Sequence, residues 1–182
     1  TYSGSLYVSE YELSTYMEET IDAFRSYANI KHINLTYESS FRYLNVWLDK
    51  DKMDSILKNI ISNALKYTPD GGNVHVFTSE TEDTWSIEVK DTGIGIPASE
   101  QKKLFKMHFR GSNAINSKVT GSGIGLLLVG KLVHLHKGKL NFSSMEGKGS
   151  CIKITFPKGN KHFRKAIQRP QPQNERIVYS AS

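Results

Sequence analysis

The sequence predicts an α+β fold, a two-layer sandwich in which helices cover one face of a mixed, mostly antiparallel sheet. Two observations support this prediction. Alternating apolar and polar residues, which are typical of strands, recur in pairs of segments that are close enough in sequence to form hairpins. Each segment with helical spacing carries an apolar stripe, so all the helices can lie on the same side of the sheet.

Length and composition favour one globular domain. The chain has 182 residues and one cysteine, Cys151, which excludes an internal disulfide and fits a reducing compartment. No apolar run approaches the ~20 residues that a membrane span needs, and no signal peptide opens the chain. Because the chain starts at Thr1 without a methionine, we expect a fragment of a longer protein.

The net charge of +6 is concentrated at the C-terminal end. From Lys158 onward there are six basic residues and one acidic residue, so this segment carries +5 and residues 1–157 carry +1. The body of the protein is therefore nearly neutral, and we expect no nucleic-acid partner. We expect residues 1–157 to form the domain and residues 158–182 to be a basic, linker-like tail.

The first half of the sequence alternates between strand and helix patterns. Leu6 and Val8 indicate a short strand, and apolar residues at helical spacing over 13–28 predict an amphipathic helix. Residues 33–37 and 44–48 alternate as strands do, with a polar turn between them.

A helix is predicted over 51–68, with Asp49 or Asp51 as its N-cap. Asn59, Asn63 and Lys66 share one face of this helix. Such a face is either solvated or holds a ligand or metal, and asparagine is a poor residue in the middle of a solvated helix. The spacing alone leaves the two interpretations open.

The second half contains two predicted hairpins and two helices. Residues 74–76 pair with 85–89, and Asp91 ends the second strand; residues 140–142 pair with 151–156, and Pro157 closes the fold. A short helix follows Pro97. A longer helix is predicted over 123–137, after a polar, Gly-rich segment without any period that we expect to be mobile.

Two glycine-spaced loops are candidates for the two ends of one nucleotide pocket. Asp91–Pro97 follows a strand, and Gly121–Gly125 opens a helix. Neither matches a Rossmann fingerprint or a P-loop, and the H-R-D and D-F-G elements of the eukaryotic-type protein kinases are absent.

The combination of four motifs in one order is more specific than either loop. They are Asn59–Thr68, Asp91–Pro97, Leu104–Arg110 and Gly121–Leu126. This order resembles the N, G1, F and G2 boxes of the catalytic ATP-binding domain of bacterial sensor histidine kinases, which belong to the Bergerat-fold (GHKL) superfamily with DNA gyrase and heat-shock chaperone ATPases. The resemblance extends from about Leu6 to Pro157, and it implies a flexible ATP lid over about 106–122.

The resemblance also implies ATP and Mg²⁺ as cofactors. Asp91 would accept a hydrogen bond from the adenine amino group, and Asn63, with Asn59, would offer amide oxygens to Mg²⁺. Asn59, Lys66 and Arg110 would form the catalytic group. The implied nucleotide-binding set is Asn59, Asn63, Lys66, Tyr67, Asp91, Gly93, Gly95, Ile96, Gly121, Ser122, Gly123, Ile124, Gly125 and Leu126.

One departure within the superfamily distinguishes a kinase from a hydrolase. In the ATP-hydrolysing members, a glutamate four residues before the N-box asparagine activates water, and here that position is Asn59. Because an amide cannot act as a general base, we expect slow hydrolysis. None of the six histidines lies in a phosphoacceptor motif, and His134 and His136 are expected to be structural.

We therefore expect a protein-histidine kinase domain that phosphorylates a histidine on its own dimerisation and phosphoacceptor domain, which lies outside this chain. A response-regulator receiver domain would be the next partner, and the linker-like tail would suit a hybrid kinase. The isolated domain would be a monomeric cytoplasmic unit of a parent anchored in the bacterial inner membrane. The alternatives are an anti-sigma-factor-type serine kinase of the same superfamily and a nucleotide-sensing module without transfer.

Overall fold

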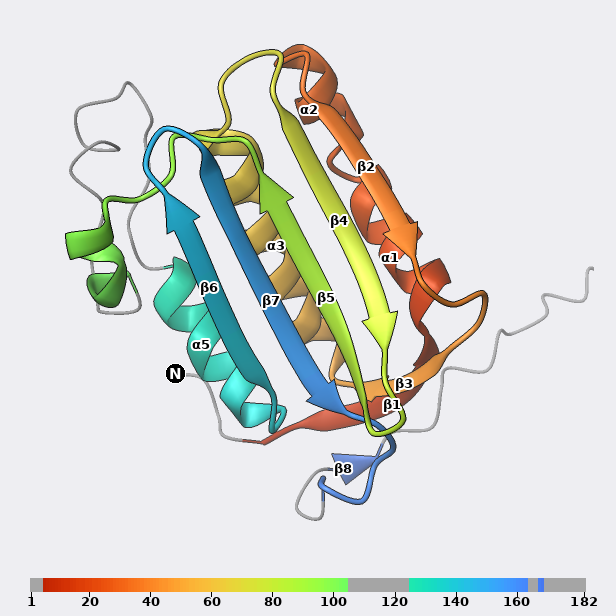
Figure 1. Cartoon of the computed structure of the whole chain (residues 1–182). Helices are drawn as coiled ribbons and strands as arrows, with labels where there is room; N and C mark the ends of the chain where they lie inside the picture. Colours follow the sequence, from red (N-terminus) through yellow and green to blue (C-terminus); the bar gives the residue numbers. More distant parts are fainter. Residues whose placement is uncertain (1–4, 105–124, 164–166, 169–182) are drawn as a thin grey trace, which may run out of the picture.

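A computed structural model describes residues 5–104, 125–163 and 167–168 (Figure 1). Its centre is a five-stranded sheet in the order β2-β4-β5-β7-β6. All neighbouring pairs in this sheet are antiparallel except β2 and β4, which are parallel. The strands are β2 (Asn34–Ser39), β4 (Asn73–Glu80), β5 (Thr84–Asp91), β6 (Lys139–Met145) and β7 (Gly149–Pro157).

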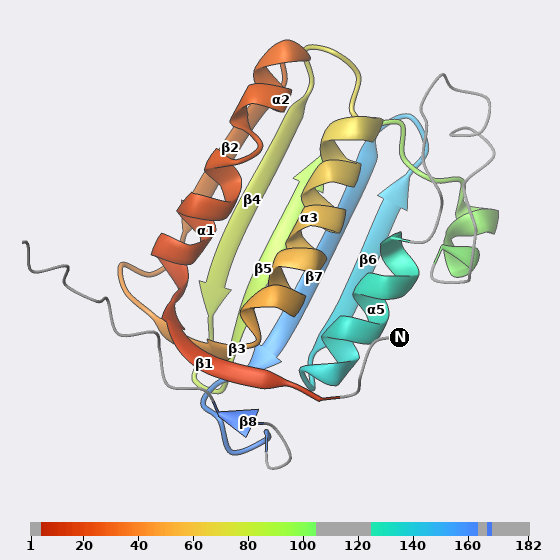
Figure 2. The same cartoon turned by 180° about the vertical axis from the view of Figure 1, so that it is seen from behind.

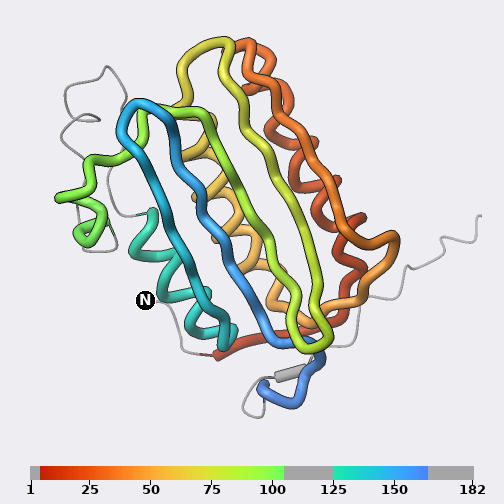
Figure 3. The backbone as a smooth tube through the Cα atoms, in the orientation of Figure 1, coloured from red at the N-terminus to blue at the C-terminus, as the bar shows by residue number. Residues whose placement is uncertain are grey.

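The helices cover one face of this sheet, as Figure 2 shows from behind. They are α1 (Leu13–Asp22), α2 (Arg25–Ile30), α3 (Lys50–Tyr67) and α5 (Gly125–Leu135), and a short 3₁₀ helix, η1, spans Ala98–Lys103. In the described part of the chain the opposite face of the sheet carries no helix, as the tube in Figure 3 also shows. This arrangement confirms the predicted two-layer α+β sandwich.

The apolar core lies between the sheet and the helices. It includes fully buried residues of α1 and α3, such as Leu13, Met17, Leu57 and Ile61. From the sheet, Trp85 packs against Phe156 with ring centroids 4.6 Å apart. Helix α3 is buried along one side and lies between α1 and α5 (Figure 2).

The first predicted helix is two helices. The pattern over 13–28 is interrupted at Ala23 and Phe24, where the N–H of Phe24 bonds to the carbonyl of Ile21 in a tighter turn. Neither glycine nor proline marks this break, and the apolar spacing continues across it. The sequence pattern therefore predicted a single helix.

The two strands after α2 belong to different sheets. β2 enters the large sheet, whereas β3 (Asn45–Leu48) pairs with β1 (Tyr7–Glu12) in a small sheet of order β3-β1-β8. A parallel pair such as β2 and β4 needs a long crossover, and β3 and α3 supply it.

Both ends of α3 are fixed by charged side chains. Asp49 is its N-cap and accepts a hydrogen bond from the N–H of Lys52. Of the two predicted caps, Asp49 is therefore the correct one, and Asp51 lies in the first turn. At the other end, the ammonium of Lys31 donates to three main-chain carbonyls of the last turn, those of Leu65, Lys66 and Thr68, at 2.7, 3.2 and 2.7 Å. The orientation of α3 is therefore set at both ends.

The segment after Pro157 contacts the body of the protein. Phe163 is buried against Leu6 and Val8, and β8 (Ile167–Gln168) pairs in parallel with the start of β1. The division between a domain ending at 157 and a tail from 158 stays a prediction, but packing onto the body continues past that point. In the described ranges, no helix is long and apolar enough to cross a membrane.

Candidate nucleotide-binding site

Asp91 ends β5 with its side chain on the same side as the helices. Its Oδ1 atom accepts two backbone hydrogen bonds, from Gly93 at 2.8 Å and from Ser150 at 3.2 Å. Among the described residues, no donor contacts Oδ2. Burial raises the pKa of this carboxyl group, and the two N–H donors only partly oppose that effect. Asp91 is thus a partly desolvated carboxyl group held through one of its two oxygens.

The loop after Asp91 packs against backbone on both sides. A Cβ atom on Gly93 would lie 2.6 Å from the carbonyl oxygen of Tyr67, and one on Gly95, whose φ is +64°, would lie 2.0 Å from that of Met145. These glycines therefore let the loop approach the end of α3 and the β6–β7 hairpin. That they also let a base approach stays a prediction.

Hydrogen bonds reinforce this packing. The N–H of Ile94 donates to the carbonyl of Tyr67 at 3.1 Å, and the N–H of Gly147 donates to the carbonyl of Ile94 at 2.7 Å. The N–H of Ile96 donates to the hydroxyl of Ser144 at 2.8 Å. Ser144 lies on β6, outside the four predicted motifs in sequence, and no sequence pattern singled it out.

The polar face of α3 has Asn59, Asn63, Lys66 and Tyr67 partly exposed. The amide nitrogen of Asn59 donates to the carbonyl of Ser55, one helical turn earlier, at 2.7 Å, so this side chain is not freely solvated. That this helix face holds a ligand stays a prediction.

The oxygen of Asn59 lies against the start of α5. A Cβ atom on Gly125 would be 2.5 Å from that oxygen, so a larger residue there would require the Asn59 side chain to shift. The structure thus brings the α3 face to the last glycine of the second loop. Eight residues separate Asn59 from Tyr67, or about 12 Å along the helix at 1.5 Å per residue. Gly125 therefore lies beside Asn59 and Gly93 lies beside Tyr67, two positions about 12 Å apart along α3.

Several predicted site residues lie outside the described residues: Arg110, Gly121, Ser122, Gly123, Ile124 and the lid over about 106–122. Leu126, which the resemblance placed at the nucleotide, is half-buried and packs against the main core.

A metal at this site would depend on amide oxygens. The described part of the chain contains no group of three or more His, Cys, Asp or Glu residues that could hold a metal ion. Asn63 and Asn59 offer oxygen ligands of the kind that Mg²⁺ accepts alongside phosphate oxygens and water. The residues present therefore fit a Mg²⁺ ion bound together with a nucleotide better than one bound by protein alone.

His136 has a structural role, as predicted. It is buried, and its Nδ1 donates to the carbonyl of Leu132 at 2.8 Å, while its Nε2 accepts the N–H of Asp49 at 3.2 Å. Burial lowers its pKa, and the bond to Leu132 opposes that shift. A neutral, buried imidazole with both nitrogens bonded is not a phosphate acceptor.

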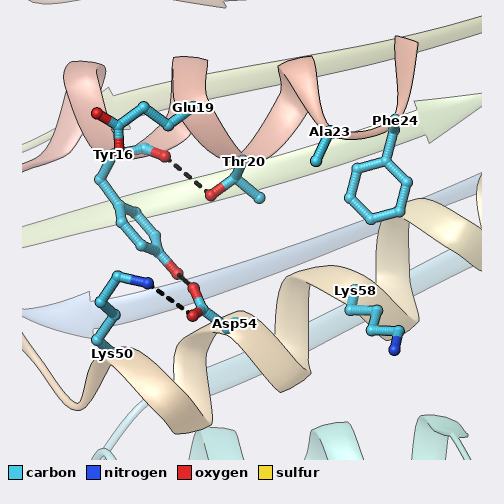
Figure 4. A pocket seen from close by; sticks show the side chains of 8 residues that line it. All are labelled: Tyr16, Glu19, Thr20, Ala23, Phe24, Lys50, Asp54 and Lys58. Atoms are coloured by element: carbon cyan, nitrogen blue, oxygen red, sulfur yellow. Dashed lines mark hydrogen bonds and ion pairs between the residues drawn. The ribbon is translucent and has the colours of Figure 1, made fainter. Parts of the chain in front are cut away.

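A separate cavity of about 440 Å³ lies between α1 and α3 (Figure 4). The hydroxyl of Tyr16 donates to Asp54 there at 2.6 Å, and Lys50 bonds to the other oxygen of Asp54. These α3 residues face α1, whereas Asn59 contacts α5. This cavity is therefore not part of the site around Asp91.

Comparison with known proteins identifies the family of this chain. Residues 48–160 match the family described as histidine kinase-, DNA gyrase B- and HSP90-like ATPases. The match covers more than half of the chain, and the chain belongs to this family.

The similar curated proteins are sensor kinases. The sensor histidine kinase WalK of Bacillus subtilis is 38% identical over 148 residues, which are 80% of this chain and 24% of WalK. The adaptive-response sensory kinase SasA of Thermosynechococcus vestitus is 33% identical over 148 residues, 80% of this chain and 38% of SasA. The chain thus spans about a quarter to two fifths of these two relatives.

Solved structures share the fold. The catalytic domain of histidine kinase ThkA superposes with a TM-score of 0.74 at 23% identity, over 84% of this chain and 97% of that one. Full-length ShkA in complex with AMPPNP gives a TM-score of 0.75 at 20% identity, over 85% of this chain and 32% of that one.

Proposed function

We propose that this chain is the catalytic, ATP-binding domain of a sensor histidine kinase. In this role it transfers the γ-phosphoryl group of ATP to a histidine on a separate dimerisation and phosphoacceptor domain. The observation that carries the proposal is the carboxylate of Asp91, whose Oδ1 is held by two backbone donors while Oδ2 is left for a ligand. The names of the similar relatives, which are sensor kinases, support it.

Asp91 selects the base. An ionised carboxylate can only accept hydrogen bonds, so Oδ2 accepts one from the amino group of adenine. Guanine has a carbonyl at that position, and two acceptors facing each other in a partly desolvated site repel. Tyr67, at the end of α3, lies next to Gly93 through its carbonyl, and its ring would pack beside the base.

The other end of the pocket binds the phosphates. Asn63 and Asn59 offer oxygens to a Mg²⁺ ion, which would neutralise phosphate charge, and Lys66 adds a positive charge on the same helix face. The backbone N–H groups of the second glycine loop, Gly121–Gly125, would face the phosphates at the start of α5. Arg110 would reach the γ-phosphate.

Transfer rather than hydrolysis follows from Asn59. The bond between the γ-phosphorus and the bridging oxygen breaks, a bond from phosphorus to an imidazole nitrogen forms, and ADP leaves. An amide at position 59 cannot deprotonate water, so the described part of the site offers no base that would favour water over histidine.

The partners follow from this role. The acceptor lies on the parent's own dimerisation domain, and a response regulator then receives the phosphoryl group; ThkA has been solved in complex with response regulator protein TrrA. The parent is anchored in the bacterial inner membrane, with this domain in the cytoplasm. The isolated domain is a monomer and binds no nucleic acid.

The proposal is tested by mixing this chain with the parent's phosphoacceptor domain and ATP labelled at the γ-phosphate. The expected product is a labelled acceptor whose phosphate is acid-labile and base-stable, as for phosphohistidine. An acid-stable phosphoserine on a separate antagonist protein would instead support the anti-sigma-factor-type serine kinase. An unlabelled acceptor, in a mixture where ATP binding is demonstrated, would contradict the kinase proposal.

A further inference from the structure

The geometry points to Ser144 and Gln101 as positioning residues of the nucleotide site: together they hold the backbone of Ile96 and so fix the loop that begins at Asp91. This inference rests on the proposed function, because it concerns the affinity of the same site for ATP. Neither residue lies in a predicted binding motif, and both act through the loop rather than on the ligand.

Ser144 holds the N–H side of Ile96. Its hydroxyl oxygen accepts the N–H of Ile96 at 2.8 Å and lies 3.0 Å from the carbonyl oxygen of Gly149, to which it donates. The hydroxyl of Ser150 is 2.8 Å away. Ser150 is also the residue whose N–H bonds to Asp91. Ser144 therefore ties the far end of the loop to the same strand that holds the carboxylate.

Gln101 holds the carbonyl side of Ile96. Its amide nitrogen donates to the carbonyl of Ile96 at 3.1 Å and to the carbonyl of Ser144 at 2.7 Å. An amide nitrogen has two hydrogens, so both donors are used. Gln101 lies in η1, so the same side chain also connects the loop to the helical turn that follows it.

Ile96, Ser144 and Gln101 are joined in a ring of hydrogen bonds, which we call the clamp. These bonds take the place of the backbone pairing that a strand would have. Both backbone polar groups of Ile96 would otherwise need other partners, because the loop runs outside the sheet there. With the clamp, the loop is fixed before a ligand binds, so binding does not have to order it. Removing the clamp should weaken binding of the base, which the loop faces, more than binding of the phosphates.

Two variants, Ser144→Ala and Gln101→Glu, disrupt the clamp, and two further variants serve as a rescue and a control. Ser144→Ala removes the acceptor for the Ile96 N–H, and Ser144→Thr restores a hydroxyl on the same strand position. Gln101→Glu keeps the shape but replaces the nitrogen that carries both donors by an oxygen that would face the same two carbonyls. Ser143→Ala is the matched control, since Ser143 is exposed on the open face of the same strand.

Calorimetric titration measures the affinity of each variant for ATP and for inorganic triphosphate. We expect Ser144→Ala to bind ATP about 3- to 10-fold more weakly, the value of one net hydrogen bond, and Gln101→Glu at least as weakly. Ser143→Ala should match the wild type, Ser144→Thr should recover most of the loss, and triphosphate should bind with unchanged affinity. Amide exchange at Ile96 in the ligand-free protein should be faster in Ser144→Ala.

The outcomes distinguish failure of the proposed function from failure of the positioning role. If the wild type does not bind ATP, the proposed function fails. If the wild type binds ATP, and both Ser144→Ala and Gln101→Glu bind ATP with the affinity of the wild type, the positioning role is overturned. Equal weakening of ATP and of triphosphate would also overturn it, because the loss would then not belong to the base end. Should Ser144→Ala fail to fold, Gln101→Glu alone decides.

Discussion

The backbone N–H of Ser150 donates a hydrogen bond to Oδ1 of Asp91 across 3.2 Å, although 59 residues separate them in sequence. The two residues are register partners in the β5–β7 pair, so the sheet itself brings the donor to the carboxylate. With Gly93 bonding to the same oxygen, Asp91 is held in one orientation, and no described donor contacts its other oxygen.

The first prediction separates backbone strain from close packing at a glycine. Gly95 and Gly71 both have positive φ, +64° and +84°, but a Cβ on Gly95 would meet the carbonyl of Met145, whereas one on Gly71 would meet nothing within 4 Å. Gly71→Ala should cost about 1–2 kcal/mol in the free energy of unfolding, the strain alone. Gly95→Ala should cost clearly more and should also weaken ATP binding. Denaturant unfolding and calorimetry measure both, and equal costs for the two variants would contradict the packing role of Gly95.

The second prediction concerns the pH dependence of stability. Burial lowers the pKa of His136 below its ordinary value of about 6.5, so the unfolded chain binds a proton more readily than the folded one. Its contribution to stability is therefore present above about pH 6.5 and is lost as the pH falls toward the lowered folded value. His162 shifts in the same direction through burial, so the wild type alone does not isolate His136.

The difference between the wild type and His136→Gln does isolate it. The free energy of unfolding of the wild type should decline more steeply between about pH 7 and pH 5 than that of His136→Gln. Equal slopes in urea unfolding at matched ionic strength would contradict a lowered pKa of His136 in the folded protein.

The third prediction tests how far the domain extends past Pro157. Phe163 is 5% exposed and packs with Leu6 and Val8. Phe163→Ala should lower the free energy of unfolding by about 3 kcal/mol, the usual cost of removing a buried aromatic ring. A chain ending at 157 should lose at least as much, and a chain ending at 168 should lose little. If the chain ending at 157 unfolds at the same denaturant concentration as the full chain, the domain ends where the sequence pattern placed it.

The sequence pattern was a good guide where local periodicity determines structure. Alternation located the strands of both hairpins and placed Asp91 at the end of one, and helical spacing placed Asn59 and Asn63 on one face of α3. These features depend on neighbours within a few residues. The structure confirms them because burial of one face selects the same residues that the period marks.

Features that depend on distant partners were not predictable in this way. No local pattern indicates that β3 pairs with β1 instead of β2, or that Phe163 returns to cover Leu6. The contact of Ser144 with the site could not be predicted from the sequence for the same reason. Ser144 is one of two adjacent serines on β6, and only the register of the sheet and the path of the loop bring its hydroxyl to Ile96.

The fourth prediction addresses the proposal's central claim, that Asp91 recognises adenine. Asp91→Asn keeps an oxygen for the bonds from Gly93 and Ser150 but presents an amide donor to the donor on the base. Because burial raises the pKa of Asp91, its charge costs stability in the free protein at neutral pH, and removing it should leave stability unchanged or higher. Asp91→Asn should therefore lower the affinity for ATP without lowering the free energy of unfolding. Asp83→Asn, at an exposed position before β5, is the matched control.

Calorimetric titration of ATP into the wild type, Asp91→Asn and Asp83→Asn tests this claim most directly. The account predicts that Asp91→Asn binds ATP about 10- to 100-fold more weakly than the wild type, the value of a hydrogen bond to a charged acceptor, while Asp83→Asn binds it as the wild type does. Equal ATP affinity for Asp91→Asn and the wild type would contradict it.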